Sequence, residues 1–506
     1  MRRFSRFWGE PGALGALTFL ALSACSVTVR EDEAPGEELT DSESKATSTQ
    51  TSHSDSETGP SSIPLVSEAL DCGVAKNIGG ITQGTGTLDL ERFTVDNALF
   101  PDAVCNDATP AIFYFRPAAN AANANRWVIQ LQGGGGCTTP AACAKRWCNV
   151  DTNFSMTQMT STTSPDKTPP VGIFARRSEE PSLPIDNPIG DSNQVMIKYC
   201  SSDAWRGAAK DVAIETVHPV TGAEVEMRLH FQGQAILQAT LNLLKRTNGS
   251  TITHAGTGAA LPDLDDATEV ILAGASAGGG GVTFNLDALA ASLKAQNPNL
   301  TVLGLIDSTF GPEGDDLDYS ASTLCAESLI CSPEALGAYG KEIQRSLWNA
   351  VEEASCEAYH ATDGQSWKCA FDTHVILNHL TTPFFVRQGL SDEVVSDGLV
   401  NTGVLILGQD YELLDFGQQV RTQFNSDLAK LTTLAEESAS ITVAPGGYAP
   451  LCSKHETLRS TADSHFVTIQ NASGTFHMFD AWNNWRNVLP NGIVVHSVNG
   501  STSTCQ

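Results

Sequence analysis

The sequence predicts an α/β protein with a mainly parallel sheet flanked by helices, and two observations lead to that prediction. First, short runs of β-branched and aliphatic residues alternate with segments whose apolar residues recur at helical spacing. Second, residues 269–293 pass from a buried-strand pattern through a glycine-rich turn directly into a helical pattern. Strands joined by helical crossovers of this length are typical of parallel sheets covered on both faces.

The first 25 residues have the pattern of an export signal. Three arginines, Arg2, Arg3 and Arg6, precede a short apolar core at 13–22, which is too short to span a bilayer. The Leu-Ser-Ala-Cys25 that follows resembles the bacterial lipobox, in which the cysteine is lipidated and becomes the first residue of the mature chain. We therefore expect residues 1–25 to be a lipoprotein signal peptide and Cys25 to carry a lipid anchor. An ordinary cleavage site with a chance cysteine is the alternative.

Residues 26–69 are rich in Ser, Thr, Glu and Asp and contain almost no large apolar residues. Such a segment cannot bury a core, so we expect a disordered tether. The remaining residues, 70–506, are predicted to form a single folded domain. This organisation predicts a protein of the bacterial cell envelope, in the periplasm or at the cell surface, or a secreted protein.

The chain is strongly acidic, with a net charge of 30 − 58 = −28. This charge argues against nucleic acids and anionic membrane surfaces as partners. The hydrophobic content of 41% and the charged content of 17% are those of a globular protein. We expect a monomer that touches a membrane only through its lipid anchor.

The cysteine count indicates a disulfide framework rather than metal sites. Leaving out Cys25, the chain has 13 − 1 = 12 cysteines, an even number in an exported protein. Short loops favour two pairs, Cys325 with Cys331 and Cys356 with Cys369. Three further cysteines are expected to pair locally or with Cys200: Cys137, Cys143 and Cys148. Their spacing does not match a zinc ribbon, and no metal or cofactor is implied.

Four more strands surround the central one at 270–272. Apolar runs predict them at 127–131, 195–200, 301–306 and 383–386, and a helical face is predicted at 236–244. A long insertion separates Asp307 from the last strand, and the two expected short disulfides bracket a helical pattern within it, between Cys325 and Cys369. Its apolar residues recur at helical spacing: Leu336, Tyr339, Ile343, Leu347 and Val351. We expect this segment either to wall or roof a pocket or to pack on the sheet edge.

The turn after the central strand reads Gly274-Ala-Ser276-Ala-Gly278, which is the G-x-S-x-G motif in a strand–turn–helix context. So tight a turn requires tiny residues beside the serine. It lifts the hydroxyl to the N-terminus of a helix, whose free N–H groups favour developing negative charge. The motif predicts Ser276 as a nucleophile on an α/β-hydrolase-like fold. A glycine-rich turn with an incidental serine is the alternative.

A serine hydroxyl needs a base to take its proton and a third group to orient that base. In α/β-hydrolases the acid and then the histidine follow the serine along the chain. Asp392 follows the strand at 383–386 and lies 392 − 276 = 116 residues after the serine. Asp307 competes with it as the acid, and Glu393 is a weaker candidate. Spacing alone does not choose among the later histidines: His455, His465, His477 and His496.

An oxyanion hole needs backbone N–H groups directed at the oxygen of the tetrahedral intermediate. One is expected from Ala277, the residue after the nucleophile. Others are expected from the glycine run at 133–136, which follows an early strand as the corresponding loop of esterases does. A flexible linker is the alternative for this run.

Six blocks of the sequence resemble the pectin acetylesterase and Notum family, in the same order along the chain from about residue 97 to residue 485. The blocks are Leu131-Gln-Gly-Gly-Gly-Gly-Cys137, Tyr199-Cys-Ser-Ser-Asp-Ala-Trp-Arg-Gly207, Ala273-Gly-Ala-Ser-Ala-Gly-Gly279, Leu305-Ile-Asp-Ser308, Ser391-Asp-Glu393 and Cys452-Ser-Lys-His-Glu456.

The resemblance implies roles that spacing leaves open. It makes His455 the base, Asp392 the acid and Asp307 a structural or pocket position. It also implies that the oxyanion amides belong to Gly134, Gly135 and Ala277. Two departures from the family pattern concern residues that the resemblance places at the acyl pocket. Glycines stand at 135 and 136, where the family usually has a bulky aromatic residue. Ser-Thr-Phe-Gly follows Asp307, where the family has a Ser-Gly-aromatic pattern.

The sequence therefore predicts a serine carboxylester hydrolase with a Ser-His-Asp triad. The resemblance implies an acylated carbohydrate as substrate, with acetyl groups removed from an O-acetylated polysaccharide. A Notum-like deacylase of longer acyl esters on proteins or lipids is the runner-up. A non-catalytic surface protein that binds glycans is the alternative from another class.

Overall fold

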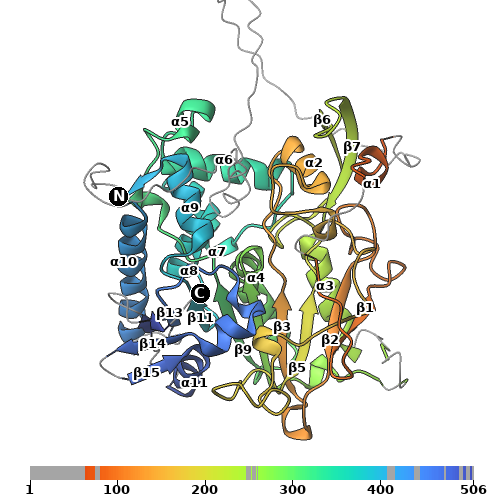
Figure 1. The fold of residues 1–506 in the computed structure, drawn as a ribbon, viewed down its shortest axis with the longest axis vertical. Coiled ribbons are helices and arrows are strands. Elements are labelled where there is room, and N and C mark those ends of the chain that lie inside the picture. Colours follow the sequence, from red (N-terminus) through yellow and green to blue (C-terminus); the bar gives the residue numbers. More distant parts are fainter. Residues whose placement is uncertain are drawn as a thin grey trace, which may run out of the picture.

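The central sheet contains ten strands in the described part of the chain, in the order β16-β13-β11-β9-β8-β3-β5-β2-β1-β4. The computed structural model describes residues 63–73, 80–246, 252–253, 258, 260–406, 416–437, 445–471, 474–488, 494–496 and 502–503. The strands from β16 to β5 pair in parallel, and β2, β1 and β4 extend the sheet with antiparallel pairs. The predicted α/β class with a mainly parallel sheet is confirmed (Figure 1).

The strands of the central sheet are β1 (Leu90–Thr94), β2 (Ile112–Arg116), β3 (Arg126–Leu131), β4 (Lys167–Thr168), β5 (Asn193–Ile197), β8 (Glu269–Ala275), β9 (Thr301–Asp307), β11 (Phe384–Arg387), β13 (Gly446–Ala449) and β16 (Val494–His496). The smaller sheets contain β6 (Ala209–Val217), β7 (Glu224–Phe231), β10 (Leu317–Asp318), β12 (Leu405–Ile406), β14 (Thr468–Asn471), β15 (Gly474–His477) and β17 (Thr502–Ser503). The α-helices are α1 (Val66–Ala69), α2 (Pro140–Cys148), α3 (Gly233–Leu243), α4 (Ala277–Lys294), α5 (Thr323–Ser328), α6 (Pro333–Ser346), α7 (Ala354–Tyr359), α8 (Asp372–Asn378), α9 (Glu393–Thr402), α10 (Phe416–Glu437) and α11 (Met478–Val488).

Side chains alternate between the two faces of the sheet along each strand. Both faces are buried, because each belongs to a hydrophobic cluster that also includes helices. In β8, Val270 and Leu272 join the cluster that includes α3 and α4, whereas Ile271 and Ala273 join the cluster that includes α11. All seven residues of β8 are buried, which explains its continuous apolar run.

The folded domain begins before the boundary that composition predicts. The signal peptide expected at 1–25, with Cys25, and most of the expected tether lie outside the described residues. Within the last part of that tether, Val66 in α1 is fully buried, and the Arg228 N–H donates to the Pro64 carbonyl over 2.9 Å. Residues 63–69 thus pack on the domain rather than belonging to a free tether, because their few apolar side chains are enough to fix one short helix.

Disulfides join distant parts of the chain. The two predicted short pairs, Cys325–Cys331 and Cys356–Cys369, are confirmed, and Cys137 pairs locally with Cys143. The expectation for Cys148 is wrong, since it pairs with Cys72, while Cys200 pairs with Cys105. These bonds span 76 and 95 residues, so their partners are set by the fold and not by loop length. Cys452 is disulfide-bonded as well.

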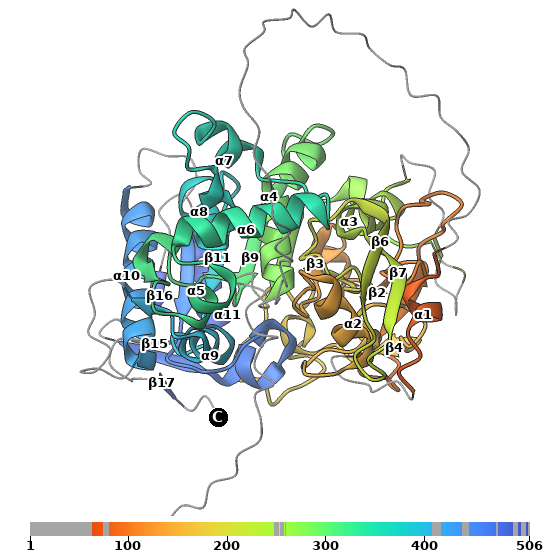
Figure 2. The same ribbon diagram turned by 90° about the horizontal axis from the view of Figure 1, so that it is seen from above.

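The first part of the insertion between β9 and β11, which contains α5 and α6, lies at the end of the sheet where β3 leads into α2 (Figure 1), whereas α8 packs beside α4. Figures 1 and 2 show α5, α6 and α2 grouped at that end of the sheet. In α6, Leu336 and Ile343 are buried, as their helical spacing predicts, whereas Val351 lies beyond the helix and is exposed. Just after α6, the indole N–H of Trp348 donates to the carbonyl of Cys137 over 3.0 Å. The insertion therefore contacts the end of the glycine run and does not only cover the sheet edge.

The helices of the described ranges include none that combines the length and apolar character needed to cross a bilayer.

Candidate active site

Ser276 occupies a sharp turn between β8 and α4. Its backbone has φ 57° and ψ −126°, a conformation that costs an L-residue about 1–3 kcal/mol. Such a conformation persists only where surrounding contacts hold it in place. The Ser276 N–H donates to the Asp307 carbonyl over 2.9 Å, which is one of those holding contacts. A Cβ at Gly278 would overlap the carbonyl oxygen of Leu131, and one at Gly274 would overlap that of Gly278. Both glycines of the motif are therefore required by close backbone packing.

The glycine run lies beside this turn because β3 and β8 are neighbours in register, with Leu131 opposite Gly274. Gly134 has φ 142° and Gly135 has φ 60°, conformations that favour glycine. A Cβ at Gly134 would collide with the side-chain amide of Gln158. The three expected oxyanion donors are thus placed on this run and, for Ala277, at the first residue of α4.

Asp392 and His455 come together because backbone pairing continues past the ends of β11 and β13. The N–H of Leu390 donates to the Pro450 carbonyl over 2.9 Å, and the N–H of Glu393 donates to the Ser453 carbonyl over 2.8 Å. These bonds align the two loops that leave the parallel strands. As a result, Nδ1 of His455 lies 2.9 Å from Oδ2 and 3.0 Å from Oδ1 of Asp392.

The Asp392 carboxylate is fully buried and held from two other sides. At the N-terminus of α9, the Val394 N–H donates to Oδ1 over 3.0 Å. The Gln388 side-chain amide donates to Oδ2 over 3.1 Å. Donors at a helix N-terminus suit a carboxylate, and here they orient it toward His455.

The environment of His455 raises its pKa above the usual 6.5. Burial is the largest single effect and acts to lower the pKa. The negative charge of Asp392, its hydrogen bond to the ring, and the charges of Glu456 and Asp307 together outweigh burial. The His455 side chain is 11% exposed, so the ring lies close to the surface of the site.

The loop that carries His455 also touches the glycine run and the serine turn. A Cβ at Gly133 would overlap the Glu456 carboxylate on one side and lie 2.5 Å from the Ala275 carbonyl on the other. The Glu456 N–H donates to the Ser308 hydroxyl over 3.1 Å. Ser276, the glycine run and the His455–Asp392 pair therefore share one end of the sheet, at the carboxyl ends of its parallel strands.

Asp307, the competing acid, holds this loop in place. Its carboxylate accepts from the Thr457 hydroxyl over 3.1 Å and from the Leu458 N–H over 3.0 Å. The Arg387 guanidinium, also buried, lies 3.2 Å from the same carboxylate. Removing one partner of a buried ion pair typically costs about 3–5 kcal/mol of folding free energy. Asp307 is thus hydrogen-bonded to the loop that carries His455 and ion-paired with Arg387.

The other acid and base candidates have different surroundings. Glu393 begins α9 with an exposed side chain. His465 is buried, with Nε2 3.0 Å from the Gly172 carbonyl, and His477 has Nδ1 3.0 Å from Asp480. The backbone of His496 ends β16, and its side chain lies outside the described part of the chain.

Lys198, which the sequence does not predict as part of the site, is buried at the same end of the sheet. It directly follows β5, and its ammonium donates to the Thr157 carbonyl over 2.6 Å. Burial, and secondarily the charge of Arg459, lowers its pKa to about 7. The neighbouring Gln158 contacts Gly134, so Lys198 lies next to the glycine run. A lysine inside the apolar run 195–200 was the signal that could have revealed it.

Groups of His, Cys, Asp and Glu close enough to hold a metal occur at three places in the described residues. They are Cys356 with His360, His374 and His379; Cys72 with Cys148 and His218; and Glu313 with Asp316 and Asp427. None of the three includes Ser276, Asp392 or His455.

Comparisons with known proteins point to one family. The family model described as Pectinacetylesterase matches residues 85–488. Palmitoleoyl-protein carboxylesterase NOTUM from Homo sapiens is 29% identical over 373 residues, which is 72% of this chain and 61% of that protein. The Xenopus laevis relative notum1' is 30% identical over 373 residues, 72% of this chain and 62% of its own length. The chain therefore spans somewhat less than two thirds of these relatives.

Among solved structures, the Wnt deacylase Notum from Drosophila matches with a TM-score of 0.52 and 22% sequence identity. The match covers 80% of this chain and 95% of that chain. At this identity the likeness shows the fold, which is the α/β-hydrolase-like architecture that the serine motif predicts.

Proposed function

This chain belongs to the pectinacetylesterase family, and from that premise we propose that it is a serine carboxylic ester hydrolase with Ser276, His455 and Asp392 as its triad. The observation that carries the proposal is the hydrogen bond between His455 and the buried Asp392, in loops that pack against the strained turn of Ser276. A protein that only binds glycans would have no need of this arrangement.

In the proposed reaction, the Ser276 hydroxyl oxygen attacks the ester carbonyl and its proton passes to Nε2 of His455. Since Nδ1 of His455 faces Asp392, the carboxylate holds the ring in the tautomer whose Nε2 is basic. The N–H groups of Gly134, Gly135 and Ala277 stabilise the oxyanion. The proton then goes to the departing alcohol, and water attacks the acyl-enzyme with His455 again as base, which releases the acid.

The acid side of the pH profile of kcat/KM is expected to have a midpoint above 6.5, because the pKa of His455 is raised. Only the neutral imidazole accepts a proton, so activity is lost as the pH falls through this raised pKa. The measurement is kcat/KM for p-nitrophenyl acetate across the acid range. Glu456→Gln removes one of the charges that raise the pKa and should shift the midpoint downward. A wild-type midpoint at or below 6.5 would contradict the assignment.

For the substrate we propose acetyl esters on an O-acetylated polysaccharide, which the family description supports. Long acyl esters on proteins or lipids are the second candidate, supported by relatives that are named palmitoleoyl-protein carboxylesterases. We expect kcat/KM for p-nitrophenyl esters to fall in the order acetate, butyrate, octanoate. A clear preference for octanoate would favour the second candidate instead. Acetyl release from acetylated pectin, xylan and chitin then identifies the polysaccharide.

We also propose that the protein is exported and held at the cell envelope through a lipidated Cys25. The disulfides support an oxidising compartment, because such bonds persist mainly outside the cytosol. The proposed state is a monomer whose partner is the acylated carbohydrate.

A further inference from the structure

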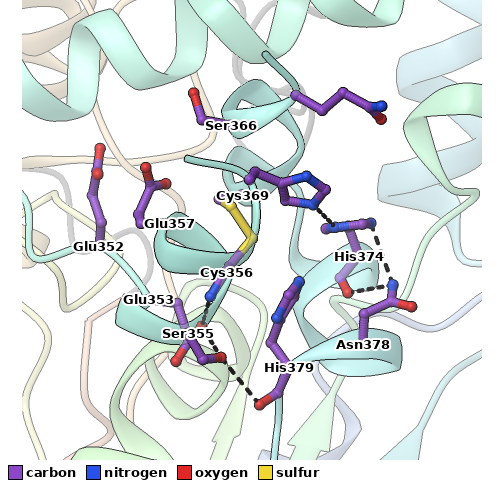
Figure 3. Close-up of a disulfide and its surroundings, with 12 residues drawn as sticks. Glu352, Glu353, Ser355, Cys356, Glu357, Ser366, Cys369, His374, Asn378 and His379 are labelled. Carbon is purple, nitrogen blue, oxygen red and sulfur yellow. Dashed lines mark hydrogen bonds between the residues drawn. A yellow bond between two sulfur atoms is a disulfide. The ribbon is translucent and has the colours of Figure 1, made fainter. Parts of the chain in front are cut away.

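Three buried histidines converge in the insertion, beside the disulfide Cys356–Cys369 (Figure 3). His360 directly follows α7, His374 lies within α8, and His379 directly follows α8. Their exposed fractions are 5%, 8% and 8%. Imidazoles are seldom gathered in this way without a reason, since each carries two polar nitrogens that need partners.

The ring nitrogens of the three residues face one another. Nε2 of His360 lies 3.0 Å from Nε2 of His374, and the ring centres of His374 and His379 are 5.3 Å apart. One ligand atom from each histidine, together with Sγ of Cys356, lies within 4.8 Å of the others. Two nitrogens bound to one tetrahedral Zn²⁺ would be about 3.3 Å apart, given Zn–N bonds of 2.0–2.1 Å. The 3.0 Å between Nε2 of His360 and Nε2 of His374 is close to this value.

His379 provides an independent observation that points to a bound ion. Its Nε2 is buried and has no hydrogen-bond partner among the described residues. A metal ion would give this unpartnered nitrogen its missing partner.

The outer nitrogens face carboxylates, as they do in metal sites where an acidic side chain fixes the ring. Nδ1 of His360 lies 2.9 Å from Asp363, and Nδ1 of His374 lies 3.5 Å from Glu313 and 3.3 Å from the Asn378 amide. Without a cation, one of the facing Nε2 atoms must carry the proton between them. With a cation bound between the two Nε2 atoms, neither would carry a proton, and the neutral ring of His374 would carry its single proton on Nδ1, toward Glu313.

We propose that His360, His374 and His379 form a binding site for one divalent transition-metal ion of the Zn²⁺ type. Cys356 is bonded to Cys369 and so supplies no thiolate, which leaves three imidazoles and one position for water. The ion would tie α7 to α8, next to the apolar contact of Cys356, Cys369 and Val375 with Phe284 of α4. Its role is to stabilise the insertion, and it does not depend on the proposed ester hydrolysis.

The test is metal binding by the full chain, purified without a histidine tag and stripped with EDTA. Titration with ZnCl₂ in a calorimeter should show about one site per chain, and Zn²⁺ should raise the Tm. His374→Ala and His379→Ala should each weaken binding by at least about 100-fold. Asp363→Ala, at an exposed residue, should weaken it about 10–100-fold without affecting folding.

The matched control is Glu342→Ala, an exposed acidic residue of α6 in the same insertion, which should bind as the wild type does. Circular dichroism reports whether each variant is folded. If a histidine variant does not fold, the comparison of Asp363→Ala with Glu342→Ala decides. A wild-type protein that takes up no Zn²⁺, or an Asp363→Ala protein that binds it as tightly as the control, would overturn the proposal.

Discussion

Replacing Ser276 by alanine is expected to lower kcat for p-nitrophenyl acetate about 10⁶-fold, because no other group can form the acyl-enzyme. The substitution removes one oxygen atom, and alanine at φ 57° has about the same backbone strain as serine, because both residues carry a Cβ atom. Stability should therefore change little. The measurements are steady-state kinetics and urea unfolding of both proteins.

The control for this substitution is Ser346→Ala, at a serine at the end of α6 whose hydroxyl donates to the Glu342 carbonyl. It should keep the activity of the wild type. Turnover by Ser276→Ala within tenfold of the wild type would rule out the proposed nucleophile. An unfolding midpoint that falls together with the activity would instead indicate a structural role.

His455→Ala is expected to lower kcat by a similar factor of about 10⁶. Without the imidazole, no group takes the Ser276 proton or protonates the leaving alcohol. His477→Ala should leave kcat within a few-fold of the wild type, because Nδ1 of His477 contacts Asp480, a side chain with no part in the proposed reaction.

Kinetics of the two histidine variants, measured side by side, decide the assignment of the base. Equal losses in both, or a larger loss in His477→Ala, would contradict it. Far-UV circular dichroism checks that each variant is folded before its activity is compared.

The serine turn could be predicted from sequence because its signal is local. The apolar run, the tiny residues beside Ser276 and the helical pattern all lie within 25 residues, and the structure has β8, a strained turn and α4 in that order. Spacing could not tell which histidine lies against Asp392, because that depends on how two loops pack. The backbone bonds from Leu390 and Glu393 to the loop before His455 bring His455 to Asp392.

The last part of the sheet was also missed for a physical reason. β13 begins with Gly446 and Gly447, which do not resemble a strand, yet a Cβ at Gly446 would collide with Trp485 of α11 and with Phe385 of β11. Close packing between neighbouring elements, rather than strand propensity, requires glycine there. The partners of Cys148 and Cys200 escaped prediction in the same way, because they are set by contacts across the fold.

The most direct test of the proposed enzyme is covalent labelling with a fluorophosphonate, followed by peptide mapping in a mass spectrometer. Such reagents react with a serine only when a neighbouring base activates it. The proposal predicts a single adduct on the peptide that contains Ser276, present in the wild type and absent from Ser276→Ala. An adduct on another residue, or equal labelling of the two proteins, would contradict it.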